Sequence, residues 1–240
     1  MKKFLLFLAV AACITSVQAQ KTINDPNAEV RNVSGFHAIK VSHAIDVYLS
    51  QSGSEAVAVS ATETKYRDRI MTTVEDGVLK VWFDNDDNWK LWNNTGNKKL
   101  KVYISFKNLD RLTASGACDV HVDGVIKANT LNINLSGASD LRGGIDAGTL
   151  VFVQSGASDA TLTGRAGDMK IDASGASSFK GYDMQTENCQ VKASGASDVK
   201  ITVTKELNAR ASGASSIQYK GGGVIRDMHT SGASSVNKRS

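Results

Sequence analysis

The chain has 240 residues, of which 41% are hydrophobic and 22% charged, so it has enough apolar sequence to bury a sizeable core. Its formal net charge is +4, which falls to +2 when the lysines at positions 2 and 3 are removed with an export signal. No run of Lys and Arg with interleaved aromatic residues is present, so the composition does not support nucleic-acid binding. Beyond the first 19 residues nothing is long and apolar enough to predict a transmembrane span.

Residues 1–19 have the layout of an export signal. A basic pair precedes an apolar stretch (Phe4–Ile14), and Val17–Ala19 offers a cleavage site. Cleavage after Ala19 is the preferred interpretation. The alternative is a lipid anchor on Cys13, because Val10–Cys13 resembles a lipobox. Both predict an exported protein in the periplasm, on the outer membrane surface or outside the cell.

Residues 20–32 are polar and are expected to form a flexible segment. An N-terminal β region follows over residues 33–110, with strands expected near 55–60, 70–75, 78–83 and 99–106 and one short helix within Thr62–Arg69. The stretch Ser42–Val47 matches Ser115–Val120 position by position. This region is therefore expected to hold either degenerate copies of the repeat described below or a sheet that caps it.

All three tryptophans lie in the segment 82–92, within an Asn- and Asp-rich stretch that predicts a long loop. An aromatic ring stacks on the apolar face of a sugar while amides and carboxylates bind its hydroxyls. The candidate ligand-binding residues are therefore Trp89, Trp92, Asp84, Asp86 and Asp87. The alternative is that the two tryptophan rings pack the loop against the fold.

The carboxylates at positions 84, 86 and 87 could also hold Ca²⁺, a hard ion that prefers oxygen ligands. The EF-hand pattern fails, because Trp89 occupies the sixth position, where Gly is required. No other cofactor is expected.

The second half of the chain repeats one tetrapeptide, Ser-Gly-Ala-(Ser/Cys), called the corner motif below. It starts at Ser115, Ser136, Ser155, Ser174, Ser194, Ser212 and Ser231. A period near 19 residues indicates one supersecondary unit that stacks on its neighbours. We call each copy a rung and assign residues 111–240 to the repeat.

Apolar residues recur in columns around the corner. The column five residues before it contains Leu131, Leu150, Met169, Cys189 and Leu207, and the column five residues after it contains Val120, Leu141, Ala160, Phe179, Val199, Ile217 and Val236. Such spacing predicts two strands per rung. A segment of variable sequence with Gly-rich turns, which we call the return, then leads the chain back to the next rung. The predicted fold is an all-β, single-stranded parallel β-solenoid of about seven rungs. We favour a right-handed β-helix, because no six-residue period of the left-handed type is present.

The corner motif itself is interpreted as structural, because small residues let successive rungs stack closely. The residue after it is acidic in four rungs, which gives a candidate surface ladder of Asp119, Asp140, Asp159 and Asp198. In adjacent rungs these carboxylates could bind a cation or act as the acid pair of a glycoside hydrolase. The alternative is that they are solvated side chains that accept hydrogen bonds from corner amides.

Two cysteines follow the export signal, Cys118 in a corner and Cys189 in a core column. They lie more than three rungs apart, which is about 15 Å and too far for a disulfide. Two free thiols are therefore expected.

The sequence predicts no catalytic residue. The four histidines have no zinc-ligand spacing, and no Gly-x-Ser-x-Gly context surrounds a serine.

The opening Gly35–Ile39, the strand Ile45–Val47, the stretch Asp76–Val81 and the repeated Ser-Gly-Ala-Ser-Asp together resemble the "Putative auto-transporter adhesin, head GIN domain" family. The resemblance covers about residues 33–236. It implies a β-helical exported protein of Bacteroides-type bacteria with an adhesin-like role, and it brings no active site to any residue.

Three hypotheses about function follow. The first is a non-catalytic binding protein for a glycan or another cell-surface component. The second is a structural envelope protein that associates with itself. The third is a polysaccharide-acting enzyme that uses the Asp ladder or the tryptophan-containing loop.

Overall fold

The computed structural model describes residues 25–85 and 98–240 of the chain. The expected export signal, with Cys13, and four candidate site residues, Asp86, Asp87, Trp89 and Trp92, lie outside the described residues. Within those two ranges no helix has the length and apolar character needed to cross a membrane.

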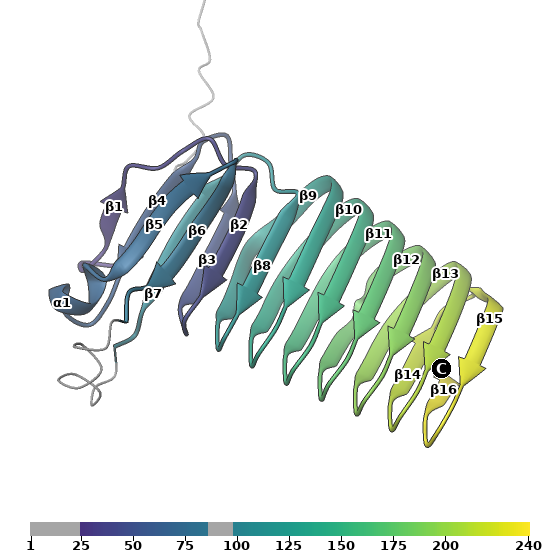
Figure 1. Ribbon diagram of the computed structural model, residues 1–240. Coiled ribbons are helices and arrows are strands. Elements are labelled where there is room, and N and C mark those ends of the chain that lie inside the picture. Colours follow the sequence, from purple (N-terminus) through teal and green to yellow (C-terminus); the bar gives the residue numbers. More distant parts are fainter. Residues whose placement is uncertain (1–24, 86–97) are drawn as a thin grey trace, which may run out of the picture.

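The described chain is almost entirely β-strand (Figure 1). Its first region contains β1 (Glu29–Arg31), β2 (Ala38–Ser42), β3 (Asp46–Gln51), β4 (Ala56–Ser60), α1 (Thr64–Arg67), β5 (Ile70–Glu75), β6 (Val78–Phe83) and β7 (Lys101–Phe106). The repeat contains β8 (Arg111–Ser115), β9 (Asp119–Leu135), β10 (Asp140–Gln154), β11 (Asp159–Ala173), β12 (Ser178–Ala193), β13 (Asp198–Ala211), β14 (Ser216–Lys220), β15 (Val224–Thr230) and β16 (Ser235–Lys238).

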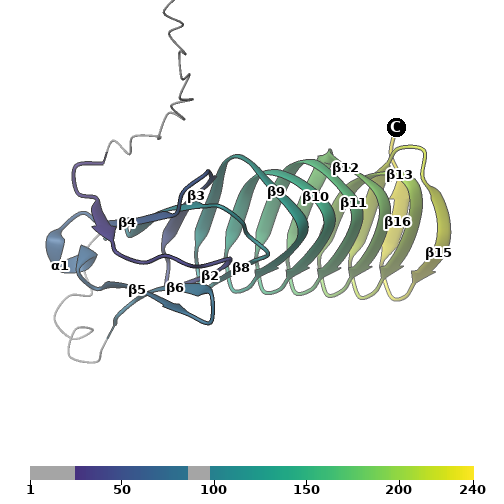
Figure 2. The same cartoon turned by 90° about the horizontal axis from the view of Figure 1, so that it is seen from above.

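From β8 onward the strands stack in parallel and form an elongated coil (Figures 1 and 2). Successive rungs pair one repeat apart, so that Leu131 lies opposite Leu150 and Leu150 opposite Met169. The column five residues before the corner is exposed by only 0–3% and lies in the core. The predicted parallel β-solenoid is confirmed.

Main-chain hydrogen bonds hold each corner to the preceding rung. The Ala157 N–H donates to the carbonyl oxygen of Gly137 at 2.7 Å, and the equivalent bonds of Ala138, Ala176, Ala196 and Ala214 measure 2.7–2.8 Å. Gly156 has a φ of +78°, and a Cβ at this position would lie 2.4 Å from the same Gly137 oxygen. Only glycine accommodates both the backbone angle and the close approach.

The fourth residue of the motif closes the corner with its side chain. Ser158 is fully buried, and its Oγ donates to the Ser155 carbonyl oxygen at 3.1 Å. The same bond forms in four other corners at 2.8–3.0 Å. The repeated serines are therefore used within the corner.

In β9 to β13 the return differs from the expected turn, whereas Gly221–Gly223 separate β14 from β15. β9 runs through it without a break for 17 residues, and the glycines bend the strand instead of ending it. The register slips at Arg142/Gly144 and at Thr161/Gly164, which marks local bulges. The return is a bent strand because its backbone groups can pair with the rung beside it.

The solenoid begins before the repeat. β2 pairs in parallel with β8, so that Ser42 lies opposite Ser115, and β3 pairs with β9, so that Val47 lies opposite Val120. His43 occupies the place of the corner glycine and also has a positive φ, 70°. The similarity between Ser42–Val47 and Ser115–Val120 thus reflects a real, degenerate corner.

Antiparallel strands close the N-terminal end. β5 pairs with β6, β4 with β7, and β1 with β4, and α1 lies beside them (Figure 1). The core side chains here are covered, since Ile70 is 1% exposed and Tyr66 of α1 and Phe83 are each 4% exposed, whereas Val30 of β1 is 78% and Met71 of β5 40% exposed. Both expected features, degenerate rungs and a cap, are present.

The expectation of a flexible segment over residues 20–32 does not hold for Glu29–Arg31, which form β1. Their backbone pairs with Val57–Val59 of β4. Asp25 adds a contact, because its carboxylate accepts a hydrogen bond from the Tyr103 hydroxyl at 2.8 Å. The polar composition of this stretch predicted solvent exposure but did not reveal the free edge of β4.

Cys118 and Cys189 are both free and buried, as predicted. Burial raises the pKa of each thiol above its usual range.

Candidate ligand-binding face

The acidic side chains after the corners form a straight row. Asp119 lies opposite Asp140 and Asp140 opposite Asp159, with Ser178 and then Asp198 in the following rungs. Parallel strands are about 4.8 Å apart, so the row has one carboxylate per rung over its first half. It lies on the solvent side of the sheet formed by β7, β3 and β9–β13, which we call the outer face.

A fifth carboxylate, which the sequence analysis did not select, extends this row. Val47 pairs with Val120, so the preceding residue, Asp46, lies beside Asp119. Burial and the neighbouring charge of Asp119 raise the pKa of Asp46 above its ordinary value, although His121 and Lys101 act in the opposite direction. We call Asp46, Asp119, Asp140, Asp159 and Asp198 the acidic column.

A second column runs beside the acidic column, two residues further along each strand. It contains Tyr103, Tyr48, His121, Arg142, Thr161, Lys180, Lys200 and Gln218. Arg142 forms an ion pair with Asp140 at 3.4 Å, and Lys200 with Asp198 at 3.2 Å. The outer face therefore presents carboxylates and cations side by side, with Asp140 and Asp198 each about one-third exposed.

The N-terminal end of the second column is aromatic. The Tyr48 ring stacks on Tyr103 with centroids 5.1 Å apart and on His121 at 5.3 Å, each pair inclined by 21°. Both faces of the Tyr48 ring are therefore covered by its neighbours in the stack. Burial and the hydrogen bond to Asp25 raise the pKa of Tyr103 above its usual range.

The described end of the tryptophan-containing loop lies near the acidic column. A hollow of about 610 Å³ is lined by His43, Asp46, Phe83, Asn85 and Lys98, among others. It connects the first carboxylate of the acidic column with both ends of the segment 86–97.

Asp84 is the one described residue among the candidate ligand-binding residues of the tryptophan-containing loop, and it already forms hydrogen bonds with Arg69. Arg69 donates to the Asp84 carbonyl oxygen at 2.8 Å and to its carboxylate at 3.2 Å. This contact fixes the end of β6 and leaves fewer Asp84 lone pairs for a ligand.

The described residues contain no cluster of three or more His, Cys, Asp or Glu that could hold a metal ion. The carboxylates of the acidic column line up along the sheet and do not converge on one point. A cation at Asp84, Asp86 and Asp87 remains a prediction, since two of these residues lie outside the described ranges.

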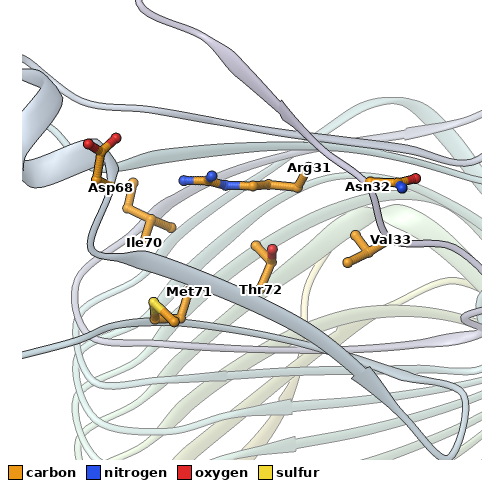
Figure 3. A pocket seen from close by; sticks show the side chains of 7 residues that line it. All are labelled: Arg31, Asn32, Val33, Asp68, Ile70, Met71 and Thr72. Carbon is orange, nitrogen blue, oxygen red and sulfur yellow. The ribbon is translucent and has the colours of Figure 1, made fainter.

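A second, smaller hollow lies at the closed end of the solenoid (Figure 3). It has a volume of about 320 Å³ between the residues after β1 and the edge of β5. Its lining includes Arg31, Val33, Ile70, Met71 and Thr72. None of the predicted site residues lies there.

The fold and the outer face define the class of protein: a parallel β-solenoid with one closed end and a flat face of ordered polar columns. The chain belongs to the family described as "Putative auto-transporter adhesin, head GIN domain", whose sequence model matches residues 35–223. The resemblance noted from the sequence is thereby confirmed.

Solved structures share this fold. A protein described as a "putative adhesin" from Bacteroides fragilis NCTC 9343 is 20% identical, with a TM-score of 0.76 over 88% of this chain and 96% of its own. A "putative lipid binding protein" from Parabacteroides distasonis ATCC 8503 is 20% identical, with a TM-score of 0.68 over 90% and 98%. Another "putative adhesin" from that strain is 17% identical, with a TM-score of 0.71 over 88% and 96%. No curated protein sequence matches this chain.

Proposed function

We propose that this protein is an exported, adhesin-like binding protein that recognises a glycan or another cell-surface component without catalysing a reaction. Its binding site is the outer face, where the acidic column lies beside the column of Tyr48, His121, Arg142, Lys180 and Lys200. The observation that carries the proposal is the one-per-rung alignment of carboxylates next to cations and aromatic rings. Family membership and neighbours described as adhesins support it.

The chemistry of this face suits an extended polar ligand. Carboxylates accept hydrogen bonds from hydroxyls, and Arg and Lys donate to them, so the rungs of Asp140 with Arg142 and of Asp198 with Lys200 offer both kinds of partner. Individual contacts at such exposed positions are weak, and several in a row are needed for useful affinity. A linear glycan can meet several rungs at once, whereas a small sugar meets one or two.

The tryptophan-containing loop is the second part of the proposed site. Trp89 and Trp92, with Asp86 and Asp87, lie in the sequence between Asn85 and Lys98, which both line the hollow at Asp46, and we include them in the proposed site on that ground. Stacking on Trp89 and Trp92 would supply the apolar contact that the self-stacked rings of Tyr48 and Tyr103 do not offer.

Two features weigh against an enzyme. The carboxylates Asp119, Asp140 and Asp159 lie on an open sheet face, and neither hollow described above includes them. A catalytic acid pair acts best where water is excluded and one carboxyl keeps its proton. Release of products from a polysaccharide, abolished by Asp140→Asn or Asp159→Asn, would replace the binding proposal with a catalytic one.

The test is a broad glycan array probed with the protein from Gln20 onward. We compare it with an Asp140→Asn/Asp159→Asn variant and a Trp89→Ala/Trp92→Ala variant. The matched control is Asp172→Asn, a carboxylate near the C-terminal end of β11, beyond the return and outside the acidic column. The Asp variant loses about 1 kcal/mol per hydrogen bond, and the Trp variant loses about 0.5–1.5 kcal/mol per stacked ring in addition to buried apolar area, so each double variant should bind at least about tenfold more weakly, while the control binds normally.

Unchanged binding by both double variants of verified fold would place the site elsewhere. Loss of binding in only one variant would assign the site to that element alone. No glycan binding by the unmodified protein would remove the glycan from the proposal.

A further inference from the structure

The solenoid has two long sides, each formed by its own series of paired strands. The first halves of β9–β13 continue the series β4, β7 and β3, whose solvent side is the outer face. The second halves continue the series β5, β6, β2 and β8 and end at β15. Figure 2 shows β5, β6, β2 and β8 along one side of the solenoid and β4 and β3 along the other. We call the solvent side of the second series the basic face.

Two columns of side chains form the basic face. In β9 the residues five, three and one before the corner are buried, so the residues four and two before each corner face solvent. These two columns and the neighbouring strand β6 contain six cations: Lys40, Lys80, Arg111, Lys170, Lys192 and Arg210. All of them are exposed except Lys80, which is half-buried.

Most of these cations have no ion-pair partner. Lys80 pairs with Glu75, and Arg210 pairs with Asp227 at 3.0 Å. The other four cations of the basic face form no ion pair with any residue of 25–85 or 98–240.

Few carboxylates offset this charge. Within the part of the chain that the structure describes, Asp172 is the one carboxylate of the basic face without an ion pair, and it lies opposite Lys192. Asp168 and Glu206, nearer to the return, accept hydrogen bonds from Asn188 and from an arginine of β15, respectively. The basic face therefore has a local excess of positive charge, although the formal charge of the chain without its export signal is only +2.

Apolar side chains lie among these charges. Trp82 is half-buried and faces the same side of β6 as Lys80, and its partner in β5, Met71, is 40% exposed. Val153, near the middle of the basic face, is 37% exposed and lies opposite Asp172. The basic face thus combines positive charge with accessible aromatic and aliphatic groups.

The cations are spread along the solenoid and do not converge on one point. From Lys40 in β2 to Arg210 in β13 there are six strand spacings of about 4.8 Å, or about 29 Å. None of the six cations lines either hollow described above. A small anion could contact one or two of these side chains, whereas an extended charged surface could contact all of them.

We propose that the basic face is a docking surface for a membrane that contains anionic, phosphate-bearing lipids. Lys and Arg side chains are attracted to the negative surface of such a membrane, and Trp is favoured at the membrane–water interface. A membrane therefore complements both the charges and the apolar groups of this face. An acidic polysaccharide would complement the charges but would leave Trp82, Met71 and Val153 in contact with water.

This inference goes beyond the proposed glycan binding, because the basic face and the acidic column lie on opposite sides of the solenoid. Anionic lipids attract the basic face and repel the carboxylates of the acidic column. Docking would therefore direct the outer face away from the membrane, where it remains accessible to a glycan.

The first test measures co-sedimentation of the protein from Gln20 onward with lipid vesicles. This form has no lipid anchor at Cys13, so any binding comes from the folded chain. We expect binding to vesicles of phosphatidylglycerol and phosphatidylcholine in equal amounts, and little binding to phosphatidylcholine alone. Added salt should weaken the binding, because it screens charges at the surface.

A charge-neutralising variant locates the contact. Lys170→Gln/Lys192→Gln should bind the mixed vesicles at least about tenfold more weakly, because each cation near an anionic surface adds severalfold to the affinity. The matched control is Lys107→Gln/Lys127→Gln, which removes the same charge from two exposed lysines at the return, where the Gln51 amide donates to both of their carbonyl oxygens. The control should bind normally.

A variant of opposite sign tests the same face. Asp172→Asn removes the carboxylate without an ion pair and should strengthen binding to the mixed vesicles severalfold. Unchanged binding in both this variant and Lys170→Gln/Lys192→Gln would overturn the proposal.

The second test identifies the side of the solenoid that contacts lipid. A polarity-sensitive fluorophore is attached to Val153→Cys on the basic face or to Thr161→Cys on the outer face. The buried Cys118 and Cys189 should not react in the folded protein. Mixed vesicles should shift the emission of the label at residue 153 to shorter wavelength and leave the emission of the label at residue 161 unchanged.

Three further results would overturn the proposal. One is failure to bind the mixed vesicles, or equal binding to phosphatidylcholine alone. Another is a response of the label at residue 161 but not at residue 153, which would mean that the outer face contacts the lipid. The third is binding to a soluble polyuronate without any response at residue 153 to vesicles, which would assign the basic face to an acidic polysaccharide. The glycan-array test stays distinguishable, because Asp140→Asn/Asp159→Asn leaves the basic face unchanged.

Discussion

Gly156 shows at the scale of one residue why the corner motif repeats. Its φ of +78° lies in a region that residues with a Cβ rarely adopt, and a Cβ would lie 2.4 Å from the Gly137 carbonyl oxygen. The same approach recurs between glycines of successive corners, for example Gly175 with Gly156 and Gly195 with Gly175. The motif is thus required by backbone stacking, whatever the ligand.

We expect Gly156→Ala to lower the free energy of unfolding by about 2–4 kcal/mol, because it adds backbone strain and a contact that the preceding rung must move to relieve. Urea unfolding followed by circular dichroism measures the change. Gly222→Ala is the control, since the nearest atom to its added Cβ is the Thr204 oxygen at 4.0 Å. An equal loss in both variants would contradict the stacking explanation.

The acidic residues of the outer face were only partly predictable at this scale. Asp119, Asp140, Asp159 and Asp198 follow an invariant motif, so their positions could be read from the repeat. Asp46 follows His43-Ala44-Ile45 instead of Gly-Ala-Ser, and its corner is recognisable only by comparison with Ser115–Val120. Because His43 stands where the motif has glycine, a sequence search for the motif does not find this rung.

At the scale of elements, the apolar columns predicted the strands well. The expected strands near 55–60, 70–75 and 78–83 are β4, β5 and β6, because alternating apolar residues there have one buried face. The alternation of apolar residues does not indicate which strands pair with one another. The pairing of β3 with β7 joins residues 46–51 to 101–106 across β4, α1 and the β5–β6 hairpin, so the stack of Tyr103, Tyr48 and His121 was not foreseen.

The hydrogen bond between Asp25, which precedes β1, and Tyr103 of β7 gives a prediction at this scale. Tyr103→Phe keeps the aromatic stack but removes the hydrogen bond to Asp25, and we expect it to lower the free energy of unfolding by about 1 kcal/mol at neutral pH. Tyr48→Phe, the control, also keeps the stack and should have little effect. Thermal unfolding of both variants measures the difference.

The effect should depend on pH. Although burial opposes it, the hydrogen bond from Tyr103 and other donors lowers the pKa of Asp25 below its ordinary value of 3.8. A lowered folded-state pKa contributes stability above the ordinary value that is lost as the pH falls through the folded-state value. The difference between wild type and Tyr103→Phe should therefore shrink in acid, and a constant difference would assign it to packing.

At the scale of the whole molecule, stacking separates the two thiols. Cys118 and Cys189 are buried in different rungs, and burial raises the pKa of both thiols. We expect neither to react with a thiol reagent in the folded protein, and both to react after denaturation without a reducing agent. Absence of thiols in the denatured protein would indicate a disulfide and contradict the parallel stack.

The closed end and the identical rungs have one further consequence, which concerns length. Each rung meets its neighbours through the same Ala–Gly corner bond and the same core columns, so removing or adding a whole copy creates no new kind of junction. The cap stays at one end and the rung of β15 and β16 at the other, while the distance between them changes in steps of about 4.8 Å. The number of repeat copies therefore sets the length of the solenoid. A protein built in this way can become longer or shorter by gaining or losing a duplicated segment, while the packing of its core stays the same.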